Sequence, residues 1–396
     1  MKLLIVTRSF DQNIGGMERH TRVLVEYLLG KGWDIDIITP NLPASSEPHF
    51  TVKGVTIKRL GNAPNELIKQ SVSFWSATRK YLLRFAGQYD AILNIGMAMA
   101  LARGLPKTTR EKVVTILHGT YRFERKTFYT SLKTNGFDPK TLFGIPYSYV
   151  FDGIQRTVIR RSALVVAISR GIRDDLINSY GLQEQKSRLI ANFVDTQMYT
   201  PARKHTSKEV EIVFLSRIHK EKGLFKLLEA LDLLQSSLKG SGMQFHCSIY
   251  GSGPDARQAA KMIKELDLQK YVTLKGAATH EEVPTILKNA DIYALPSLRS
   301  EGLPIALLEA MSTELACVVS DTEGNNELIQ HEVTGLLVKK GDASDLAEKL
   351  EKLVRDGKLR RKLGSAAREE VEQEYEVHSS LAAFDTVLKS VTPHKG

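Results

Sequence analysis

Short apolar runs alternate with more polar segments along the chain, and they do so in two separate series. The first series includes KLLIVT (2–7), DIDIIT (34–39) and AILNI (91–95), and the second begins at EIVFLS (211–216). Runs of this length predict strands, and the longer amphipathic segments between them predict helices. Strands that alternate with helices form parallel sheets with helical crossovers. The sequence therefore predicts an α/β protein with two doubly wound, Rossmann-like domains.

The stretch NFVDTQMYTPARKHTSKEVE separates the two series, because it is rich in turn-forming and charged residues and lacks an apolar period. We place the domain boundary there, with an N-terminal domain over residues 1–200 and a C-terminal domain over 201–375. The remaining segment, 376–396, predicts an amphipathic closing helix. We expect the carboxyl ends of both sheets to face one cleft, where the loops after the strands bind ligands.

Positive charge is concentrated in the first half of the chain. Residues 1–200 contain 28 Lys and Arg against 16 Asp and Glu, whereas residues 201–396 contain 27 against 29. This asymmetry predicts an anionic partner for the first half. The segments 66–85 and 120–133 mix aromatic with basic residues. Such a segment either lies at a membrane interface or forms a core helix with a solvated basic face. No nucleic-acid-binding module is recognised, so nucleic acid is not expected as a partner.

Several observations bear on cellular location. No apolar run approaches the about 20 residues that span a bilayer. The start, MKLLIVTRSF, is too short and too soon polar for a signal peptide. Cys247 and Cys317 lie far apart inside apolar stretches, which predicts reduced core thiols and neither a disulfide nor a metal site. We expect a cytoplasmic protein, and the basic first half adds attachment to the inner face of the cell membrane as a further expectation.

The stretch SEGLPIALLE (300–309) follows a predicted strand and carries two glutamates, Glu301 and Glu309. Pro304 suits the first turn of a helix, because its missing N–H would have no partner there. The free N–H groups at that helix start form an anion site; they belong to Leu303, Ile305 and Ala306. The side chain of Glu309, on the flank of this helix, can reach the same cleft. In the alternative interpretation, Glu301 lies in a solvated loop and Glu309 lies on the exposed surface of a helix, and neither binds a ligand.

Other candidates also follow predicted strands. Arg217 and Lys222 lie in SRIHKEKG (216–223), and two cations at a strand end suit a diphosphate, although a solvated charge cluster is the alternative. The pair Gly15-Gly16 precedes a helix and either allows close approach of a ligand or forms an ordinary turn. His118, at the end of VVTILH, either contacts a sugar hydroxyl or an oxyanion, or is structural.

Two patterns are interpreted as structural. GSGPDA (251–256) fits the dinucleotide fingerprint, but it lies in the second domain after a full strand–helix unit and not in the first βα turn. Asp34 and Asp36 form a D-x-D pattern that could suggest a metal. Their side chains share one face of a predicted strand, which indicates strand geometry and no metal.

Taken in chain order, GG, LHG, VVAISR, NFVD, SRIHKEKG, YGSGP and SEGLPIALLEAM resemble a retaining glycosyltransferase of family four (group one), which has the GT-B fold. The E-x7-E pair of Glu301 and Glu309 is its most specific element, and SDTEGNNELI followed by TGLLV adds to it. The resemblance covers nearly the whole chain and is strongest over residues 210–340.

This resemblance implies roles for the candidate residues. Glu309 would hold the ribose of a nucleotide sugar, and Glu301 would bind the donor sugar's hydroxyls. Arg217 and Lys222 would clamp the diphosphate, so no metal or other cofactor is expected. His118 would contact the donor sugar near the reacting carbon. Backbone contacts to the donor would come from Gly15, Gly16, Gly251, Gly302, Leu303, Pro304 and Ile305.

The implied activity is transfer of a hexose or N-acetylhexosamine from a UDP-sugar to a lipid-linked or lipopolysaccharide-type acceptor, with retention. A soluble or protein acceptor, a non-catalytic sugar-nucleotide-binding relative and an NAD-dependent oxidoreductase remain as alternatives. Two positions depart from the family pattern: Phe193, where glycine is frequent, and Glu323, where a second glycine is common. The second departure could change how the donor is seated.

Overall fold

The computed structural model describes residues 1–10, 16–41, 52–61, 67–100, 104–126, 129, 139–201 and 209–392, except for the side chains of 67–70 and 139–143. The chain divides into two compact units, one formed by Met1–Ala191 with His378–Gly396 and the other by Asn192–Val377. The second unit begins at Asn192, close to the expected domain boundary near residue 200. The end of the chain, His378–Gly396, groups with the first unit.

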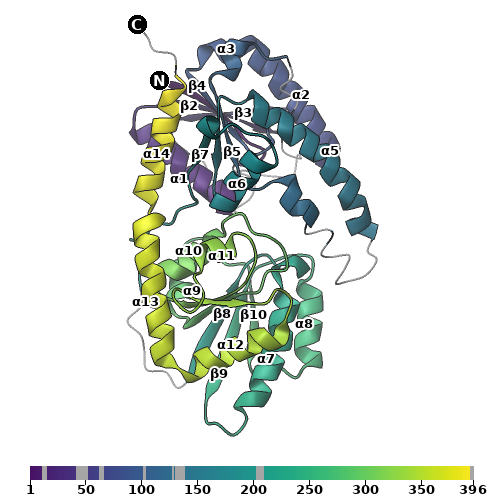
Figure 1. The fold of residues 1–396 in the computed structure, drawn as a ribbon, viewed down its shortest axis with the longest axis vertical. Helices are drawn as coiled ribbons and strands as arrows, with labels where there is room; N and C mark the ends of the chain where they lie inside the picture. Colours follow the sequence, from purple (N-terminus) through teal and green to yellow (C-terminus); the bar gives the residue numbers. More distant parts are fainter. Residues whose placement is uncertain are drawn as a thin grey trace. The chain divides into compact units, whose positions relative to one another are not determined.

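The first unit contains a parallel sheet of seven strands among its described residues, in the order β3-β2-β1-β4-β5-β6-β7 (Figure 1). The strands are β1 (Lys2–Val6), β2 (Asp34–Pro40), β3 (Val55–Leu60), β4 (Ala91–Ile95), β5 (Val113–Leu117), β6 (Leu164–Ala167) and β7 (Ser187–Leu189). The helices of this unit are α1 (Gly16–Gly30), α2 (Leu67–Phe85), η1 (Ala86–Gln88), α3 (Lys107–Arg110), α5 (Pro139–Arg161), α6 (Arg170–Asn178), η2 (Glu184–Lys186) and α14 (Val377–Ser390).

The described part of the second unit forms a six-stranded parallel sheet in the order β10-β9-β8-β11-β12-β13. The strands are β8 (Glu209–Leu215), β9 (Gln244–Tyr250), β10 (Val272–Gly276), β11 (Ile292–Leu295), β12 (Ala316–Ser320) and β13 (Leu336–Val338). The helices are η3 (Lys220–Lys222), α7 (Leu224–Leu238), α8 (Ala256–Glu265), α9 (Val283–Lys288), α10 (Ile305–Ser312), α11 (Asn325–Leu328), α12 (Ala343–Arg355) and α13 (Gly357–Glu374).

Both sheets are doubly wound, as predicted. The strand order reverses between β1 and β4 in the first sheet and between β8 and β11 in the second. Ligands in such sheets bind outside the carboxyl ends of the strands at this switch point. The loops after β8 and β11 therefore occupy the position where the second unit is expected to bind a ligand.

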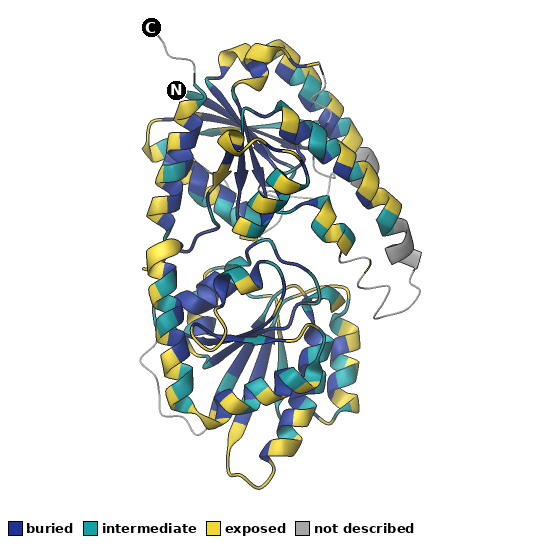
Figure 2. Cartoon of the chain, viewed as in Figure 1, coloured by how far each residue is buried: buried dark blue, intermediate teal, exposed yellow. Residues whose placement is uncertain are grey.

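The central strands of each sheet are buried on both faces, and Figure 2 shows them in dark blue. On α2, the helix in the first basic-aromatic segment, Phe74 and Trp75 are 0% and 3% exposed and belong to the core of the first unit. Of the two alternatives for this segment, a core helix is the one observed, because these rings point into apolar packing and not toward solvent.

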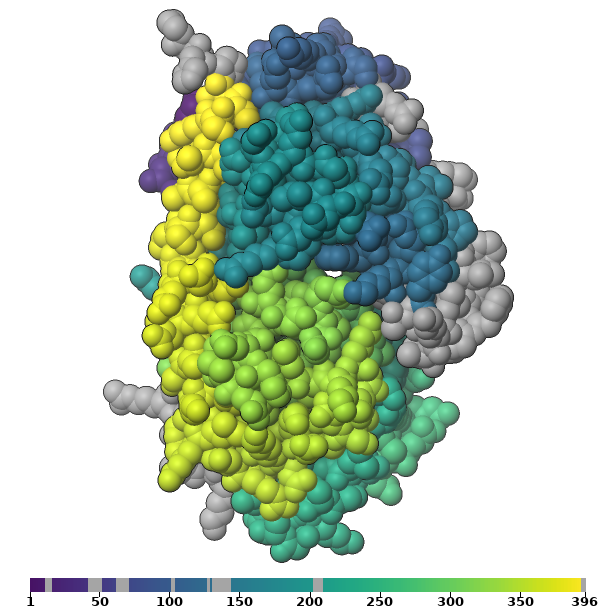
Figure 3. Space-filling view, in the orientation of Figure 1, coloured from purple at the N-terminus to yellow at the C-terminus, as the bar shows by residue number. Residues whose placement is uncertain are grey.

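The end of the chain completes the first unit. The Trp33 indole Nε1 donates a hydrogen bond of 2.8 Å to Asp385 on α14, and both side chains are buried. Figure 3 shows α14 as the yellow surface beside the teal surface of the first unit. A helix far along the sequence thus covers a sheet that begins at the N-terminus. None of the helices within the described ranges is long and apolar enough to cross a membrane.

Candidate active site

Two loops at the switch point of the second sheet form the candidate site. The loop after β8 contains η3 and ends at Gly223, whose φ is 76°. A Cβ atom at this position would overlap the carbonyl oxygen of Pro296, at the end of β11. Glycine is suited both to the left-handed backbone and to the close approach. The backbone of the β8 loop is therefore pressed against the loop that follows β11.

Lys222 and Glu301 form an ion pair across these two loops. Lys222 Nζ lies 2.8 and 2.9 Å from the two carboxylate oxygens of Glu301. The Ser297 hydroxyl donates to Glu301 Oε1 at 2.6 Å. The side chains of Lys222 and Glu301 are only 15% and 10% exposed. Charge-assisted hydrogen bonds between partly buried groups fix both side chains in place. An ammonium group and a carboxylate thus lie side by side at the carboxyl ends of β8 and β11.

The charge of Glu301 is stabilised by this arrangement. Burial of the carboxylate raises its pKa, but the charge of Lys222 and the hydrogen bonds from Lys222 and Ser297 outweigh burial. The net effect lowers the pKa of Glu301 below its ordinary value. Glu301 is therefore ionised at neutral pH and can accept hydrogen bonds, whereas a general acid would need a raised pKa.

A third loop, after β12, supports the backbone of Glu301. The Glu301 N–H donates to the Glu323 carbonyl oxygen at 2.9 Å, and the Ser300 hydroxyl donates to the Glu323 carboxylate. At Gly324, where φ is 85°, a Cβ atom would press on the carbonyl oxygen of Glu301. The loops after β11 and β12 are therefore packed backbone against backbone.

The start of α10 adjoins this loop. Pro304 is the N-cap of the helix, which begins at Ile305, one residue later than the first-turn position predicted for the proline. The N–H groups of the first turn have no partner inside a helix, and they carry the positive end of its dipole. The buried side chain of Asn192 donates 2.7 Å to the Leu303 carbonyl oxygen. This bond holds the turn of Gly302 and Leu303 against the first residues of the second unit.

Glu309 lies further along α10 and is buried, with 5% exposure. Burial is the main cause that raises the pKa of the Tyr293 hydroxyl on β11 well above its ordinary value, and the negative charges of Glu309 and Glu301 add to this effect. Both glutamates of the E-x7-E pair thus act on the same buried phenol. Neither is a solvated surface residue, so the alternative of a loop and a surface glutamate is wrong.

Arg217 and Gly251 lie on the neighbouring loops after β8 and β9. Arg217 is exposed, so its side chain can reach a ligand outside the sheet edge. A Cβ atom at Gly251 would overlap the Ser216 carbonyl oxygen, and one at Gly253 would overlap that of Ile218. The glycines of GSGPDA therefore serve to pack these two loops together. Asp255 is the N-cap residue of α8, and its carboxylate accepts from Lys220 N at 2.6 Å.

In the first unit, Gly16 begins α1, and Gly15 lies outside the described residues. His118 follows β5 and is partly buried. Desolvation lowers the pKa of His118 to about 4, so its ring is neutral at pH 7 and can either donate or accept one hydrogen bond. Gln155, buried on α5, bonds to both Gly119 O and Tyr121 N at 3.1 Å and holds the loop that carries His118.

The patterns interpreted as structural have structural partners. Asp36 is 4% exposed and accepts hydrogen bonds of 2.6 Å from both Lys58 and Tyr89. Both cysteines are free and buried, and burial raises the pKa of each thiol. Among the residues that the structure describes, no three His, Cys, Asp or Glu side chains gather in a way that could hold a metal ion.

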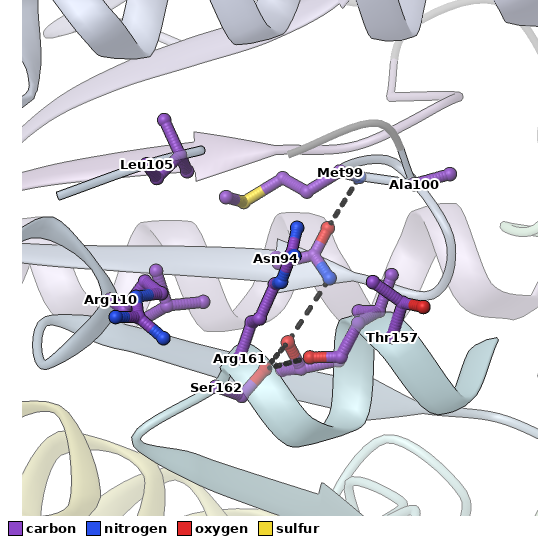
Figure 4. A pocket seen from close by; sticks show the side chains of 11 residues that line it. Asn94, Met99, Ala100, Leu105, Arg110, Thr157, Arg161 and Ser162 are labelled. Carbon is purple, nitrogen blue, oxygen red and sulfur yellow. Dashed lines mark hydrogen bonds between the residues drawn. The ribbon is translucent and has the colours of Figure 1, made fainter. Parts of the chain in front are cut away.

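A separate pocket of about 310 Å³, part of it open to solvent, lies in the first unit beside β4, β5 and the end of α5 (Figure 4). Asn94 accepts from Met99 N at 3.0 Å and donates to the Thr115 hydroxyl at 3.1 Å, which lies 2.7 Å from the Ser162 hydroxyl. These bonds join the side chains of Asn94, Thr115 and Ser162, so we interpret the network as a brace between two strands and a helix.

Several contributors to the site are absent from the sequence-based candidates: Asn192, Ser297 and Ser300. Ser297 lies three residues before the start of SEGLPIALLE, and Asn192 opens the quoted motif NFVD. Their contacts involve residues 4 and 111 positions away. The short spacing between Ser297 and Glu301 could have suggested their contact. Nothing in the sequence suggests the contact between Asn192 and Leu303.

Comparison with known proteins agrees with this architecture. The family model described as Glycosyltransferase Family 4 matches residues 14–198, and the one described as Glycosyl transferases group 1 matches residues 197–370. The amylovoran biosynthesis glycosyltransferase of Erwinia amylovora is 29% identical over 347 residues, which cover 86% of this chain and 78% of that protein. Together the two models span nearly the whole chain.

Solved structures of glycosyltransferases share the fold. WaaG, a glycosyltransferase involved in lipopolysaccharide biosynthesis, aligns over 100% of both chains with a TM-score of 0.74 and 13% identity. HepE of Anabaena, crystallised with UDP and glucose, aligns over 98% of this chain and 100% of its own, with a TM-score of 0.72 and 19% identity. The chain belongs to glycosyltransferase family four, the group one glycosyltransferases, and its two units have the Rossmann-like folds of GT-B enzymes.

Proposed function

We propose that this protein transfers a hexose or N-acetylhexosamine from a UDP-sugar to an acceptor hydroxyl, with retention at the anomeric carbon and without a metal ion. The observation that carries the proposal is the Lys222–Glu301 pair at the switch point of the second sheet, beside the start of α10. An ammonium group suits a diphosphate, and a buried ionised carboxylate suits sugar hydroxyls. HepE, which shares the fold, was crystallised with UDP and glucose.

In the proposed reaction, the bond between the anomeric carbon and the diphosphate oxygen breaks, and a bond to the acceptor oxygen forms on the same face. The acceptor proton passes to the leaving diphosphate oxygen. Lys222, Arg217 and the N–H groups at the start of α10 stabilise the charge that develops on the diphosphate. Glu301 orients the sugar and keeps its charge, so it is not one of two carboxylates flanking a scissile bond as in a glycosidase.

A lipid-linked or lipopolysaccharide-type acceptor is the acceptor class that we propose. The surplus of positive charge in residues 1–200 favours an anionic surface. Exposed aromatic and aliphatic residues near the end of the helical residues 121–126 and on α5 offer a contact for it; they are Tyr129, Tyr147, Tyr149 and Val150. Arg125 stacks on the Tyr149 ring at 4.1 Å, so a cation accompanies the aromatic group. WaaG, a protein of the same fold, is involved in lipopolysaccharide biosynthesis.

Vesicle binding tests the membrane part of this proposal. The protein should co-sediment with vesicles that contain phosphatidylglycerol at low salt and should not do so with pure phosphatidylcholine. Val150→Ser with Tyr149→Ser should weaken sedimentation, whereas Val72→Ser, at an exposed site on α2, should not. Absence of binding to anionic vesicles at low salt would favour a soluble acceptor.

The catalytic role of Arg217 is tested by the Arg217→Ala variant. The exposed guanidinium contributes little to folding, so the melting temperature should stay within about 1 °C, in line with a surface substitution. Release of UDP from UDP-sugars in the presence of envelope lipid extract should fall about a hundredfold in kcat. Arg257→Ala, at an exposed position on α8, is the matched control. Near-normal turnover by Arg217→Ala would remove this residue from the mechanism.

A further inference from the structure

Arg8 lies just beyond the end of β1, at the switch point of the first sheet. The strand order reverses between β1 and β4, and doubly wound sheets bind ligands outside the carboxyl ends of their strands at this point. Arg8 is partly buried, and its guanidinium donates a hydrogen bond of 2.7 Å to the Ser71 hydroxyl on α2. Throughout the part of the chain that the structure describes, no carboxylate forms an ion pair with Arg8. A neutral hydroxyl thus holds a charged group at the ligand-binding edge of this sheet.

This environment of Arg8 is unfavourable for folding alone. A guanidinium stays protonated in proteins, and partial removal of a charge from water without an opposite charge nearby costs free energy. Other buried charges of the first unit are paired: Lys58 Nζ lies 2.6 Å from the Asp36 carboxylate, and Arg156 Nε lies 3.1 Å from that of Asp152. Departures from such local rules are expected at functional sites. The position of Arg8 therefore favours a role in binding an anion.

A cluster of aromatic rings adjoins the same edge of the sheet. Tyr121, in the segment after β5, has its ring centroid 5.4 Å from that of Phe151 on α5. Phe151 stacks on Tyr147 at 4.1 Å and lies 5.9 Å from Trp75 on α2. Trp75 is 3% exposed, whereas Tyr147 is 37% exposed. The cluster thus extends from the core to a tyrosine that solvent can reach.

The charge of Arg8 acts on two rings of this cluster. Burial is the largest cause that raises the pKa of the Tyr121 and Tyr147 hydroxyls above their ordinary value, and the positive charge of Arg8 opposes it at each. Both phenols are therefore protonated at neutral pH and can donate hydrogen bonds. The charge of Glu124 also acts on both phenols, but Glu124 is exposed and its charge is screened by solvent. A cation and two phenol donors thus lie within electrostatic reach of one another.

We propose that Arg8 and Tyr147 form an acceptor subsite for an acidic glycan, in which Arg8 binds a phosphate or carboxylate group and Tyr147 packs against the sugar ring. The planar guanidinium carries several N–H donors, so the bond to Ser71 leaves others for an oxyanion. Aromatic walls with a few placed polar groups are typical of small-molecule sites. The inference rests on the proposed function, because it takes a glycan as the acceptor, and it adds an acidic group on that glycan.

Saturation-transfer NMR of the full chain with three hexoses tests this subsite. Glucose, glucuronate and glucose 6-phosphate differ only at carbon six, which is a hydroxymethyl group, a carboxylate or a phosphate ester. Saturating UDP is present, so that the probes do not occupy a diphosphate site. The wild type should bind both acidic hexoses about tenfold or more tightly than glucose, the size expected for one charge-assisted contact. Arg8→Gln should abolish this preference, and Tyr147→Ala should weaken all three hexoses by a similar factor.

Arg84→Gln is the matched control. It removes the same charge from an exposed position at the other end of α2, so the preference for acidic hexoses should persist. The melting temperature is a second readout. Arg8→Gln should leave it unchanged or raise it, because an unpaired charge is removed, whereas loss of a structural arginine would lower it.

Three results would overturn the subsite. The first is equal binding of the three hexoses by the wild type, and the second is a preference that survives in Arg8→Gln. The third is a loss of UDP binding in Arg8→Gln as large as the loss for the acidic hexoses, which would assign Arg8 to the donor. Isothermal titration with UDP measures the last of these. If the wild type itself does not bind UDP, the proposed function fails, and this inference fails with it, so the two failures are distinguishable.

Discussion

Glu301 shows how a single buried carboxylate can be kept charged. Burial alone would raise its pKa, and the ammonium of Lys222 reverses that effect. The two residues are 79 positions apart, so their pairing depends on the adjacency of β8 and β11. The sequence indicates both residues as candidates because each follows a predicted strand. It does not indicate that they contact one another.

The pH dependence of stability should reveal this pairing. Because the folded-state pKa of Glu301 is below its unfolded value, the pair stabilises the protein above about pH 4.5, and that stability is lost as the pH falls through the folded-state pKa. At pH 7, Glu301→Gln should cost about 3 kcal/mol in the free energy of unfolding, because Lys222 loses its partner while largely buried. Chemical denaturation at several pH values measures this, and the cost should shrink toward pH 4.

The control for this measurement is the same substitution in a Lys222→Met background. Without the ammonium group, a charged Glu301 no longer has a stabilising partner. The decrease in the free energy of unfolding on acidification that this pair causes should therefore disappear. A cost of Glu301→Gln that stays constant or grows between pH 7 and pH 4 would contradict the pairing as the origin of the lowered pKa.

At the scale of elements, apolar runs predict most of the strands. KLLIVT contains β1, and AILNI coincides with β4. Two strands are missed for physical reasons. β3 is partly exposed along its length and carries Lys58 and Arg59, so it lacks an apolar run, and β7 has only three residues. Both are edge strands of the first sheet, and an edge strand pairs with another strand on one side only.

The start of α10 depends on a support that no local pattern indicates. NFVD shows an asparagine, but only the fold brings Asn192 to the Leu303 carbonyl. Phe193, which departs from the family pattern, is buried. This departure therefore affects the packing next to Asn192. Motifs thus predict which loops form the site, whereas the residues that hold those loops depend on tertiary contacts.

Asn192→Ala tests this support. The Leu303 carbonyl would lose its donor in a buried position, which should cost about 1–2 kcal/mol in the free energy of unfolding. The looser turn at the start of α10 should also raise KM for the nucleotide sugar in steady-state kinetics. Asn326→Ala, which removes an exposed hydrogen bond to Asp321, should leave both quantities nearly unchanged. Equal effects of the two variants would mean that Asn192 has no special role.

At the scale of the whole molecule, the chain is two doubly wound units with separate sheets and separate cores. The last helix belongs to the first unit, where the Trp33–Asp385 hydrogen bond joins segments 352 positions apart. The carboxylate and ammonium groups of the candidate donor site all lie within the second unit. Nucleotide binding should therefore be a property of the loops after β8 and β11.

Binding of nucleotides to the purified full chain tests the central claim most directly. Thermal stability would be measured with UDP, GDP, ADP and NAD, each also as its sugar conjugate where one exists. A ligand that binds only the folded state stabilises it by about 2.7 kcal/mol at a hundred times its Kd. We predict such stabilisation with UDP or UDP-sugars, lost in Lys222→Ala. Stabilisation by NAD alone, or by no nucleotide, would contradict a sugar-nucleotide site at the Lys222–Glu301 pair.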